Sequence, residues 1–264
     1  MGRLFWFSAT GNSYKAAEKI AAVNSDFTLV KITDHLIASA EIIEDEDIGL
    51  VFPVFSWTLP EPVKEFIRKT EFKNVKYCFS VITMGASAGR AGDVLRKMLL
   101  KKGVELSFFR TVKMPDNCIY LYNPSASKGK EYIDSVLKEA AAKTETLAEK
   151  IKSRETSLVI SKNILGWILT YGVGSLFKKQ YPGFDKKFIV SDKCTGCGIC
   201  RDVCSVSNIK IEDKRAVFSG NCILCMACIN WCPEKAINYK KVTINRTRYH
   251  YPGLPFTALK DKHN

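Results

Sequence analysis

The sequence predicts an α/β protein in which a five-stranded, doubly wound parallel sheet is followed by a small, cysteine-rich α+β domain. Apolar runs of strand length alternate with helical patterns over the first part of the chain, and such alternation is typical of parallel sheets covered by helices. Eight of the ten cysteines fall within the last third of the chain. With 264 residues and 46% hydrophobic content, the chain is long enough to form two hydrophobic cores.

The hydrophobic pattern defines five strands and four helices. The predicted strands are Arg3–Phe7, Phe27–Ile32, Ile48–Phe52, Tyr77–Ile82 and Val104–Val112. The predicted helices are Ser13–Ala22, Glu61–Lys69, Gly92–Lys101 and Gly129–Lys152. Sheets of this kind bind ligands beyond the carboxyl ends of their strands, where the strand order reverses. Functional residues are therefore expected in the loops that follow the strands.

The loop after the first predicted strand is rich in hydroxyl groups. Ser8, Thr10, Gly11, Asn12 and Ser13 lead directly into a predicted helix. Hydroxyl, amide and backbone N–H groups at a helix N-terminus suit a terminal phosphate, although Ser or Thr before a helix is also an ordinary cap. The loop lacks the glycine pattern of dinucleotide folds and the Gly-Lys-Ser/Thr of nucleotide triphosphatases. It resembles the phosphate loop of flavodoxins.

The resemblance to flavodoxins implies that residues 1–155 form an FMN-binding domain. Three loops would converge on one crevice and hold the flavin. The implied cofactor-binding residues are Ser8, Thr10, Gly11, Asn12 and Ser13 in the first loop, Pro53, Val54, Phe55, Ser56 and Trp57 after the third strand, and Thr83, Met84, Gly85 and Gly89 after the fourth.

The chain departs from the common flavodoxin pattern, in which aromatic residues flank both faces of the flavin ring. The loop after the fourth strand contains no tyrosine or tryptophan. Trp57 or Phe55 would cover one face of the ring, and the alternative is that Trp57 only packs its own loop. The other face would be open, or covered by Met84, Tyr120 or Tyr122.

Residues 156–185 are predicted to form an apolar helical connector. The segment is strongly apolar but is interrupted by Lys162, Asn163 and several glycines, so it falls short of the apolar length of a membrane-spanning helix. We expect its apolar face to pack between the two domains. The alternative, not favoured here, is attachment to a membrane surface, helped by the lysines at 178, 179, 186 and 187.

Two cysteine runs of identical spacing dominate residues 186–264. They are Cys194-x2-Cys197-x2-Cys200-x3-Cys204 and Cys222-x2-Cys225-x2-Cys228-x3-Cys232. This spacing is that of the ligands of two 4Fe-4S clusters, in which the fourth cysteine of each run crosses to the other cluster. One predicted set is therefore Cys194, Cys197, Cys200 and Cys232, and the other is Cys222, Cys225, Cys228 and Cys204. Two alternatives to the clusters are disfavoured. Zinc modules usually separate two cysteine pairs by a longer loop, without a third and fourth cysteine in each run. A disulfide framework needs an oxidising compartment, which nothing in the sequence indicates.

Residues 186–240 resemble a bacterial-type ferredoxin with two clusters. Pro233 follows the last cysteine of the second run, as in that family, whereas Ser205 stands where the first run usually has proline. Of the other cysteines, Cys78 lies in an apolar strand and Cys118 has no cysteine or histidine partner nearby in the sequence, so both are predicted to be structural.

The three histidines receive no catalytic role. His35 and His263 are expected at the surface. His250 belongs to the basic, aromatic tail 246–252, which would either fold back over a domain or help to dock a partner. No other residues form a recognisable acid–base pair, so no catalytic residue is assigned.

Charge indicates the class of partner. The 40 basic and 27 acidic residues give a net charge of +13, which steers acidic partners. Acidic redox proteins such as ferredoxin or flavodoxin, or an oxidoreductase, are expected. Nucleic acid is not, because no nucleic-acid recognition motif accompanies the basic residues. The short apolar start lacks the features of a signal peptide, and iron-binding thiolates suit a reducing cytoplasm.

Nearly the whole chain resembles flavodoxin–ferredoxin fusion proteins of anaerobic bacteria and archaea. The resemblance implies an electron-transfer protein that passes electrons between FMN and two 4Fe-4S clusters and on to redox partners. Two alternatives stay open: a flavin-dependent reductase of a quinone or nitro compound fed by the clusters, and a scaffold that has lost FMN. Whether the protein is an enzyme, and its oligomeric state, are left open.

Overall fold

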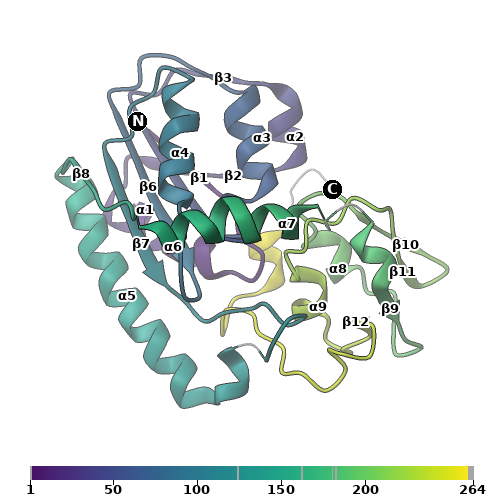
Figure 1. Cartoon of the computed structure of the whole chain (residues 1–264). Helices are drawn as coiled ribbons and strands as arrows, with labels where there is room; N and C mark the ends of the chain where they lie inside the picture. Colours follow the sequence, from purple (N-terminus) through teal and green to yellow (C-terminus); the bar gives the residue numbers. More distant parts are fainter. Residues whose placement is uncertain (1, 124, 162, 180, 182, 261–264) are drawn as a thin grey trace. The chain divides into compact units, whose positions relative to one another are not determined.

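The computed structural model of the chain describes residues 2–123, 125–161, 163–179, 181 and 183–260 (Figure 1). The chain divides into two compact units. The first consists of Met1–Ser8, Ser13–Met114 and Val136–Lys178, and the second of Ala9–Asn12, Pro115–Ser135 and Lys179–Asn264. Compared with the predicted ranges 1–155, 156–185 and 186–264, this division joins most of the connector to the first unit. It also joins two early segments to the cysteine-rich unit.

A parallel sheet forms the centre of the first unit. Its strands are β1 (Gly2–Trp6), β2 (Phe27–Lys31), β4 (Asp47–Pro53), β6 (Tyr77–Met84), β7 (Phe108–Lys113) and β8 (Ser157–Leu158), in the order β2-β1-β4-β6-β7-β8. All neighbouring pairs are parallel. The first five strands thus have the flavodoxin-like order 2-1-3-4-5, which confirms the predicted fold class. The two-residue edge strand β8 and the small pair β3 (Ile42–Ile43) and β5 (Glu71–Phe72) were not predicted.

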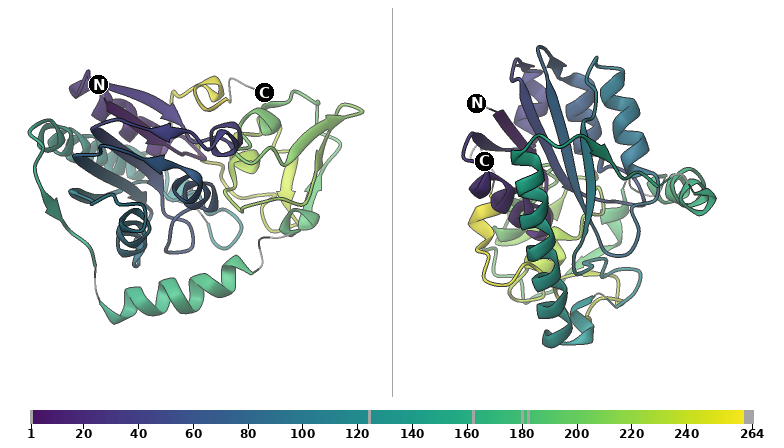
Figure 2. Two further views of the ribbon diagram at one scale, coloured as in Figure 1. Left: turned by 90° about the horizontal axis from the view of Figure 1, so that it is seen from above. Right: turned by 90° about the vertical axis from the view of Figure 1, so that its left-hand side faces the viewer.

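Helices cover both faces of this sheet (Figures 1 and 2). On one face, α1 (Asn12–Val23) lies beside α5 (Lys130–Lys152), where Asn24 Nδ2 donates to Ala148 O over 3.1 Å. On the other lie α2 (Asp34–Ser39), α3 (Glu61–Lys69) and α4 (Ala91–Leu100). Since helices cover both faces, the central strands are buried on both sides, as the continuous apolar sequence of β4 and β6 requires. The six-residue helix α2 was missed because it is too short for a periodic pattern.

The connector is helical, as predicted. It comprises α6 (Ile164–Trp167), a π-helical stretch η2 (Ile168–Val173) and α7 (Gly174–Lys178). Asn163 caps its N-terminus by accepting a 2.7 Å hydrogen bond from Gly166 N. Its large apolar side chains are exposed, and its small residues contact the first unit instead. That its apolar face packs between the two domains stays a prediction. Within the described ranges, no helix combines the length and the apolar character needed to cross a membrane.

The second unit contains two small antiparallel sheets. Strand β9 (Phe188–Val190) pairs with β12 (Ile237–Tyr239), and β10 (Ile209–Glu212) pairs with β11 (Arg215–Phe218). The short helices are α8 (Ile199–Asp202) and α9 (Ala227–Trp231), with 3-10 turns at Ser125–Lys128, Phe184–Lys187 and Phe256–Leu259. The core includes Ile119, Phe184, Ile209, Ile229 and Ile237. This α+β arrangement is the one predicted for the cysteine-rich domain.

Candidate functional site

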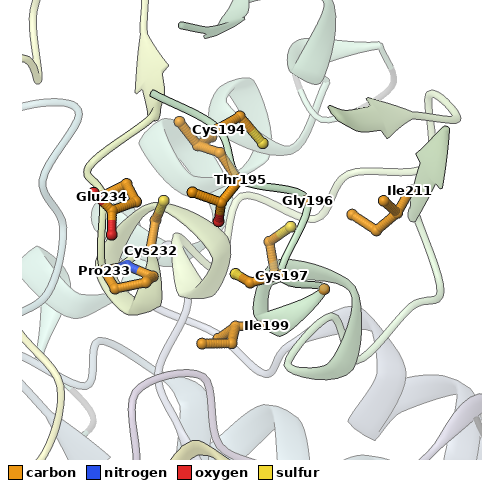
Figure 3. A pocket seen from close by; sticks show the side chains of 12 residues that line it. Cys194, Thr195, Gly196, Cys197, Ile199, Ile211, Cys232, Pro233 and Glu234 are labelled. Carbon is orange, nitrogen blue, oxygen red and sulfur yellow. The ribbon is translucent and has the colours of Figure 1, made fainter. Parts of the chain in front are cut away.

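Four cysteines line one pocket in the second unit (Figure 3). They are Cys194, Cys197, Cys200 and Cys232, the first of the two sets predicted from the crossed spacing. The pocket encloses about 330 Å³, counted with space that is open to solvent. The loop that carries the first three turns tightly at Gly196 and Gly198, whose φ values are +69° and +81°. A Cβ at Gly196 would lie 2.8 Å from Lys214 Cα, so only glycine fits there.

The other four cysteines also influence one another. Burial raises the pKa of Cys222 to about 12, and the charge of Cys204 adds to this effect. Burial likewise raises the pKa of Cys225, with Cys204 and Cys222 contributing. These influences of Cys204 on Cys222 and Cys225 are consistent with the crossed pattern, and the ligand set itself stays a prediction.

The two sets lie near each other within the second unit. Burial raises the pKa of Cys200 to about 12, and Cys232, Cys194 and Cys197 raise it further. The pKa of Cys228 is raised by burial and then by nearby thiols, of which Cys200 belongs to the first set. Among the described residues, no three histidine, cysteine or carboxylate side chains are close enough to hold a single metal ion.

Backbone N–H groups point at three of the cysteine sulfurs. Asn208 N donates to Cys204 Sγ over 3.3 Å, Leu224 N to Cys222 Sγ over 3.4 Å, and Ala236 N to Cys232 Sγ over 3.3 Å. Such bonds stabilise a thiolate relative to a thiol. They are also one of the means by which proteins tune a sulfur-ligated metal centre.

A partly buried arginine accompanies the first set. Nη2 of Arg248 donates to Asn238 Oδ1 over 2.7 Å and to Ile237 O over 3.3 Å. Its Nε and Nη1 atoms are buried and have no hydrogen-bond partner among the described residues. Burial lowers the pKa of Arg248, and the sulfurs of Cys232 and then Cys228 act in the opposite direction. Unpartnered N–H groups beside these sulfurs fit an anionic, sulfur-rich group.

A buried carboxylate accompanies the second set. Oδ2 of Asp185 accepts hydrogen bonds from Asn208 Nδ2 at 2.7 Å and Gly220 N at 2.9 Å. Its Oδ1 atom is buried without a partner in the described part of the chain. The charge of Asp185 contributes to the raised pKa of Cys222. The two sets therefore share a spacing but differ in the charge beside them.

In the first unit, three loop segments that were assigned to FMN meet at the carboxyl ends of neighbouring strands. The hydroxyls of Ser13 and Thr83 are 2.7 Å apart, and Val54 N donates to Thr83 O over 2.9 Å. Both hydroxyls are buried. Their mutual hydrogen bond uses only one of the two hydroxyl hydrogens, so the other is available to an anionic oxygen.

The loop after β4 contains a strained turn. Phe55 and Thr58 exchange two backbone hydrogen bonds of 3.0 Å, and Ser56 and Trp57 between them have φ values of 46° and 57°. Two successive positive φ values define a type I′ turn, which normally takes Asn-Gly. Strain in non-glycine residues is common at functional sites. Sequence reasoning missed this turn because Ser-Trp is not a turn signal.

Contacts with the connector fix this turn. Thr170 Oγ1 donates to Trp57 O over 2.9 Å and accepts from Arg90 N over 2.8 Å. The Trp57 ring lies 6.2 Å from that of Phe177, centroid to centroid. These contacts favour the interpretation in which Trp57 packs its own loop. Phe55 stays a candidate for the flavin face, with its ring edge-on to Phe7 at 6.0 Å.

The segment Ala9–Asn12 belongs to the second unit and is held there by side chains far away in the sequence. Asn117 Nδ2 donates to Thr10 Oγ1 over 3.0 Å, and Asn12 Nδ2 donates to Pro115 O over 2.9 Å. Tyr249 Oη donates to Asn12 Oδ1 over 2.7 Å. None of these partners carried a signal in the sequence, because amide and phenol side chains bond in many settings.

The basic, aromatic tail folds back within the second unit. Tyr251 N donates to Thr10 O over 2.7 Å, and a Cβ at Gly11 would lie 2.5 Å from Leu254 Cδ2. Trp231, which directly precedes Cys232, donates from Nε1 to Ala9 O over 3.0 Å and stacks on His250. Residues Ala9–Asn12, the middle of the predicted phosphate segment, are thus in the same compact unit as the cysteine sets.

The other predicted positions are accounted for as follows. Cys78 is fully buried, and burial raises its pKa. Burial also raises the pKa of Cys118 to about 12, so both thiols fit a structural role. Tyr120 packs against the core of the second unit, with its ring edge-on to that of Phe184. His35 is exposed, as predicted, and His263 lies outside the described residues.

Comparisons with known proteins identify a family for part of the second unit. Residues 186–233 match the family described as a 4Fe-4S dicluster domain. No curated protein matches the chain. The chain thus joins a sheet of flavodoxin-like strand order to a segment that matches a 4Fe-4S dicluster domain.

Several solved structures are similar to the N-terminal part. The match with a flavodoxin from the domain Archaea covers 57% of this chain and 98% of the flavodoxin, at 17% identity and a TM-score of 0.35. The match with Megasphaera elsdenii flavodoxin covers 54% of this chain and 99% of the flavodoxin, at 24% identity and a TM-score of 0.35. The match with the NAD(P)H:quinone oxidoreductase from Methanothermobacter marburgensis covers 60% of this chain and 98% of the oxidoreductase, at 11% identity and a TM-score of 0.40. Because these values are low, the similarities carry no argument about function.

Proposed function

We propose that the protein transfers electrons between an FMN and two 4Fe-4S clusters and passes them to acidic redox proteins. The observation that carries this proposal is the exchange of the fourth cysteines. Cys232 lines the pocket of the first run, and Cys204 contributes to the raised pKa of Cys222 and Cys225 in the second. Ligand sets that cross in this way are typical of two neighbouring 4Fe-4S clusters.

The cysteines would act as thiolate ligands. Buried thiols keep their protons until a cation replaces them, so the raised pKa of Cys200 and Cys222 fits positions where iron takes the place of a proton. The N–H groups aimed at Cys204, Cys222 and Cys232 would stabilise the thiolates. Each cluster supplies one-electron chemistry, whereas a flavin accepts one electron or two.

FMN would be held by the loops after β1, β4 and β6. The hydroxyl pair of Ser13 and Thr83 would supply a hydrogen to the phosphate, at the N-terminal end of α1. The loop of Pro53–Trp57 would border the flavin ring. Gly11, with a φ of +99°, allows the backbone of the phosphate loop to turn where another residue would be strained.

The phosphate segment and the cysteine sets would be coupled mechanically. Trp231 bonds Ala9 and directly precedes Cys232, and Asn12 is bonded by Tyr249 of the tail. All these residues belong to the second unit. Within this unit, these contacts would hold the segment Ala9–Asn12 at a constant distance from the cysteine set that contains Cys232.

The expected partner is acidic and the expected setting is a reducing cytoplasm. The net charge of +13 would steer an acidic carrier toward the protein. Screening shortens that attraction from about 10 Å at 0.1 M salt to about 3 Å at 1 M. Reduction by an acidic ferredoxin should therefore slow steeply as salt is raised, whereas reduction by a neutral dye should not.

The test is cofactor content and single-turnover transfer in anaerobically purified protein. We expect about eight iron, about eight sulfide and about one FMN per chain, and the flavin should reduce through the clusters. Cys197→Ala should lose one cluster and slow this transfer, whereas the matched Cys118→Ala should not. If Cys197→Ala and Cys222→Ala together leave the rate of flavin reduction by the carrier unchanged, the flavin acts alone and the proposal fails.

FMN binding has its own test. Thr10→Ala with Ser13→Ala should weaken FMN binding by about 2 to 4 kcal/mol, since each change removes a hydroxyl from a charged group. Riboflavin, which lacks the phosphate, should bind these variants as it binds the unchanged protein. An equal loss of both ligands would show that the loop supports the fold and does not hold a phosphate.

A further inference from the structure

The connector helix packs on the first unit through its smallest residues. Gly166, Thr170 and Gly174 are buried and lie four positions apart, so they form one stripe along the helix. A Cβ at Gly174 would lie 2.5 Å from Ser56 O, and one at Gly166 would lie 3.4 Å from Gly89. The helix therefore approaches the loops after β4 and β6 closely.

The opposite side of the same helix carries large apolar side chains. The exposed fractions are 73% for Ile164, 60% for Leu165, 49% for Trp167, 46% for Ile168, 40% for Tyr171 and 62% for Leu176. A soluble monomer rarely gathers exposed apolar side chains into one patch, and such patches mark protein or membrane contacts. The usual amphipathic arrangement, with large apolar residues facing the core, is reversed here.

Charge indicates what covers this patch. Residues 156–184 contain lysines at 162, 178 and 179 and not a single aspartate or glutamate, and Lys179 is exposed. A second copy of the chain would also carry a net charge of +13 over its whole length, and this like charge disfavours self-association. An anionic lipid surface has the complementary charge.

The aromatic residues also suit a lipid surface. Trp167 and Tyr171 lie next to each other on the exposed side, with ring centroids 5.8 Å apart. Tryptophan and tyrosine are enriched at the boundary between lipid headgroups and acyl chains. The connector is too short to span a bilayer, which needs about 20 apolar residues, but a helix that lies in the interface has no such requirement.

We propose that Ile164–Lys178 is an interfacial membrane-binding helix that lies flat on an anionic bilayer. Its large apolar side chains would enter the headgroup region, and the exposed Lys179 would contact anionic lipids. Thr170 would meanwhile keep its hydrogen bonds to Trp57 and Arg90. The loops after β4 and β6 would thereby be held beside the membrane. This inference does not depend on any bound cofactor.

The experiment is flotation of the anaerobically purified full chain with lipid vesicles. One vesicle population is phosphatidylcholine alone, and the other is phosphatidylcholine mixed with phosphatidylglycerol. We expect binding to the mixed vesicles, and at least about a tenfold weaker binding for the double variant Leu165→Gln/Ile168→Gln. The matched control, Val217→Gln/Val242→Gln, replaces two exposed apolar residues elsewhere and should bind unchanged.

Tryptophan fluorescence and further variants also test the binding of the helix to vesicles. Tryptophan emission should shift to shorter wavelength with mixed vesicles, and Trp167→Phe should abolish this shift. If the double variant unfolds, Leu176→Gln replaces it, with circular dichroism as the control for folding. Absence of binding to the mixed vesicles, or equal binding by the apolar variants, would overturn the proposal. So would a dimer in lipid-free solution that the same variants dissociate, because a second copy would then cover the helix.

Discussion

The two cysteine sets share one spacing but differ in the charge beside them. Arg248 accompanies the pocket of Cys194, Cys197, Cys200 and Cys232, with its strongest influence from Cys232. Asp185 instead accompanies Cys222 in the other set. A reduced cluster carries one more negative charge than an oxidised one, so a cation stabilises it and a carboxylate destabilises it. Identical ligand patterns can thus produce two centres of different potential.

The largest expected effect tests the membership of each set. Cys194→Ala, Cys232→Ala and the pair together should each lose about four iron atoms, because all three changes affect one cluster. Combining Cys232→Ala with Cys222→Ala should remove nearly all iron. Iron and sulfide analysis of anaerobic protein makes the measurement, with Cys118→Ala as the control. If Cys232→Ala and Cys222→Ala together lost only one cluster, the crossed assignment would be wrong.

Arg248 provides the next largest expected effect. Arg248→Leu removes a partly buried cation and its unpartnered N–H groups, and we expect the potential of the first cluster to fall by on the order of 50 to 100 mV. Arg248→Lys keeps the charge and should restore part of the loss. Redox titration followed by electron paramagnetic resonance measures both. An unchanged potential in Arg248→Leu would show that the arginine does not cause a difference between the two clusters.

A smaller change of opposite sign is expected at Asp185. Asp185→Asn keeps the shape and one acceptor oxygen, so the bonds to Asn208 and Gly220 can persist. Loss of the negative charge should raise the potential of the second cluster by on the order of 20 to 50 mV. The same titration tests this expectation. A fall in potential, or a shift confined to the first cluster, would contradict it.

The smallest expected effect is common to both sets and appears in iron-free protein. In the folded chain the pKa of Cys200 and of Cys222 is raised to about 12 from 9.0. A thiol whose pKa is raised on folding contributes stability below its unfolded pKa, and that stability is lost as the pH rises. The denaturation midpoint should therefore fall between about pH 9 and pH 12. A constant midpoint would show that burial does not hold these protons.

Much of the fold follows from local patterns in the sequence. Strands β4 and β6 are continuous apolar runs, because helices bury both of their faces. Helix α3 has the predicted bounds Glu61–Lys69, since Pro62 and the acidic start favour its N-terminus. Helix α2 and strand β8 were missed, because six and two residues are too few for a period to show.

The connector shows the limit of such patterns. Its apolar content predicted a helix, and a helix forms. A sequence pattern cannot say which side of an apolar helix faces the protein, because glycine and threonine pack closely where larger residues do not fit. The contacts of Gly166 and Gly174 with the loops after β4 and β6 decided that orientation.

For the candidate site, the sequence alone predicted which cysteines form a set and determined which loops follow the strands. Both features depend on spacing along the chain, and local backbone geometry determines from that spacing which way the side chains point. Only the tertiary structure decided that Arg248 and Asp185 accompany different sets, and that Tyr249 bonds Asn12, 237 positions away. Contacts between residues that lie far apart in the sequence depend on how whole helices, strands and loops pack. A local pattern of residues therefore cannot predict them.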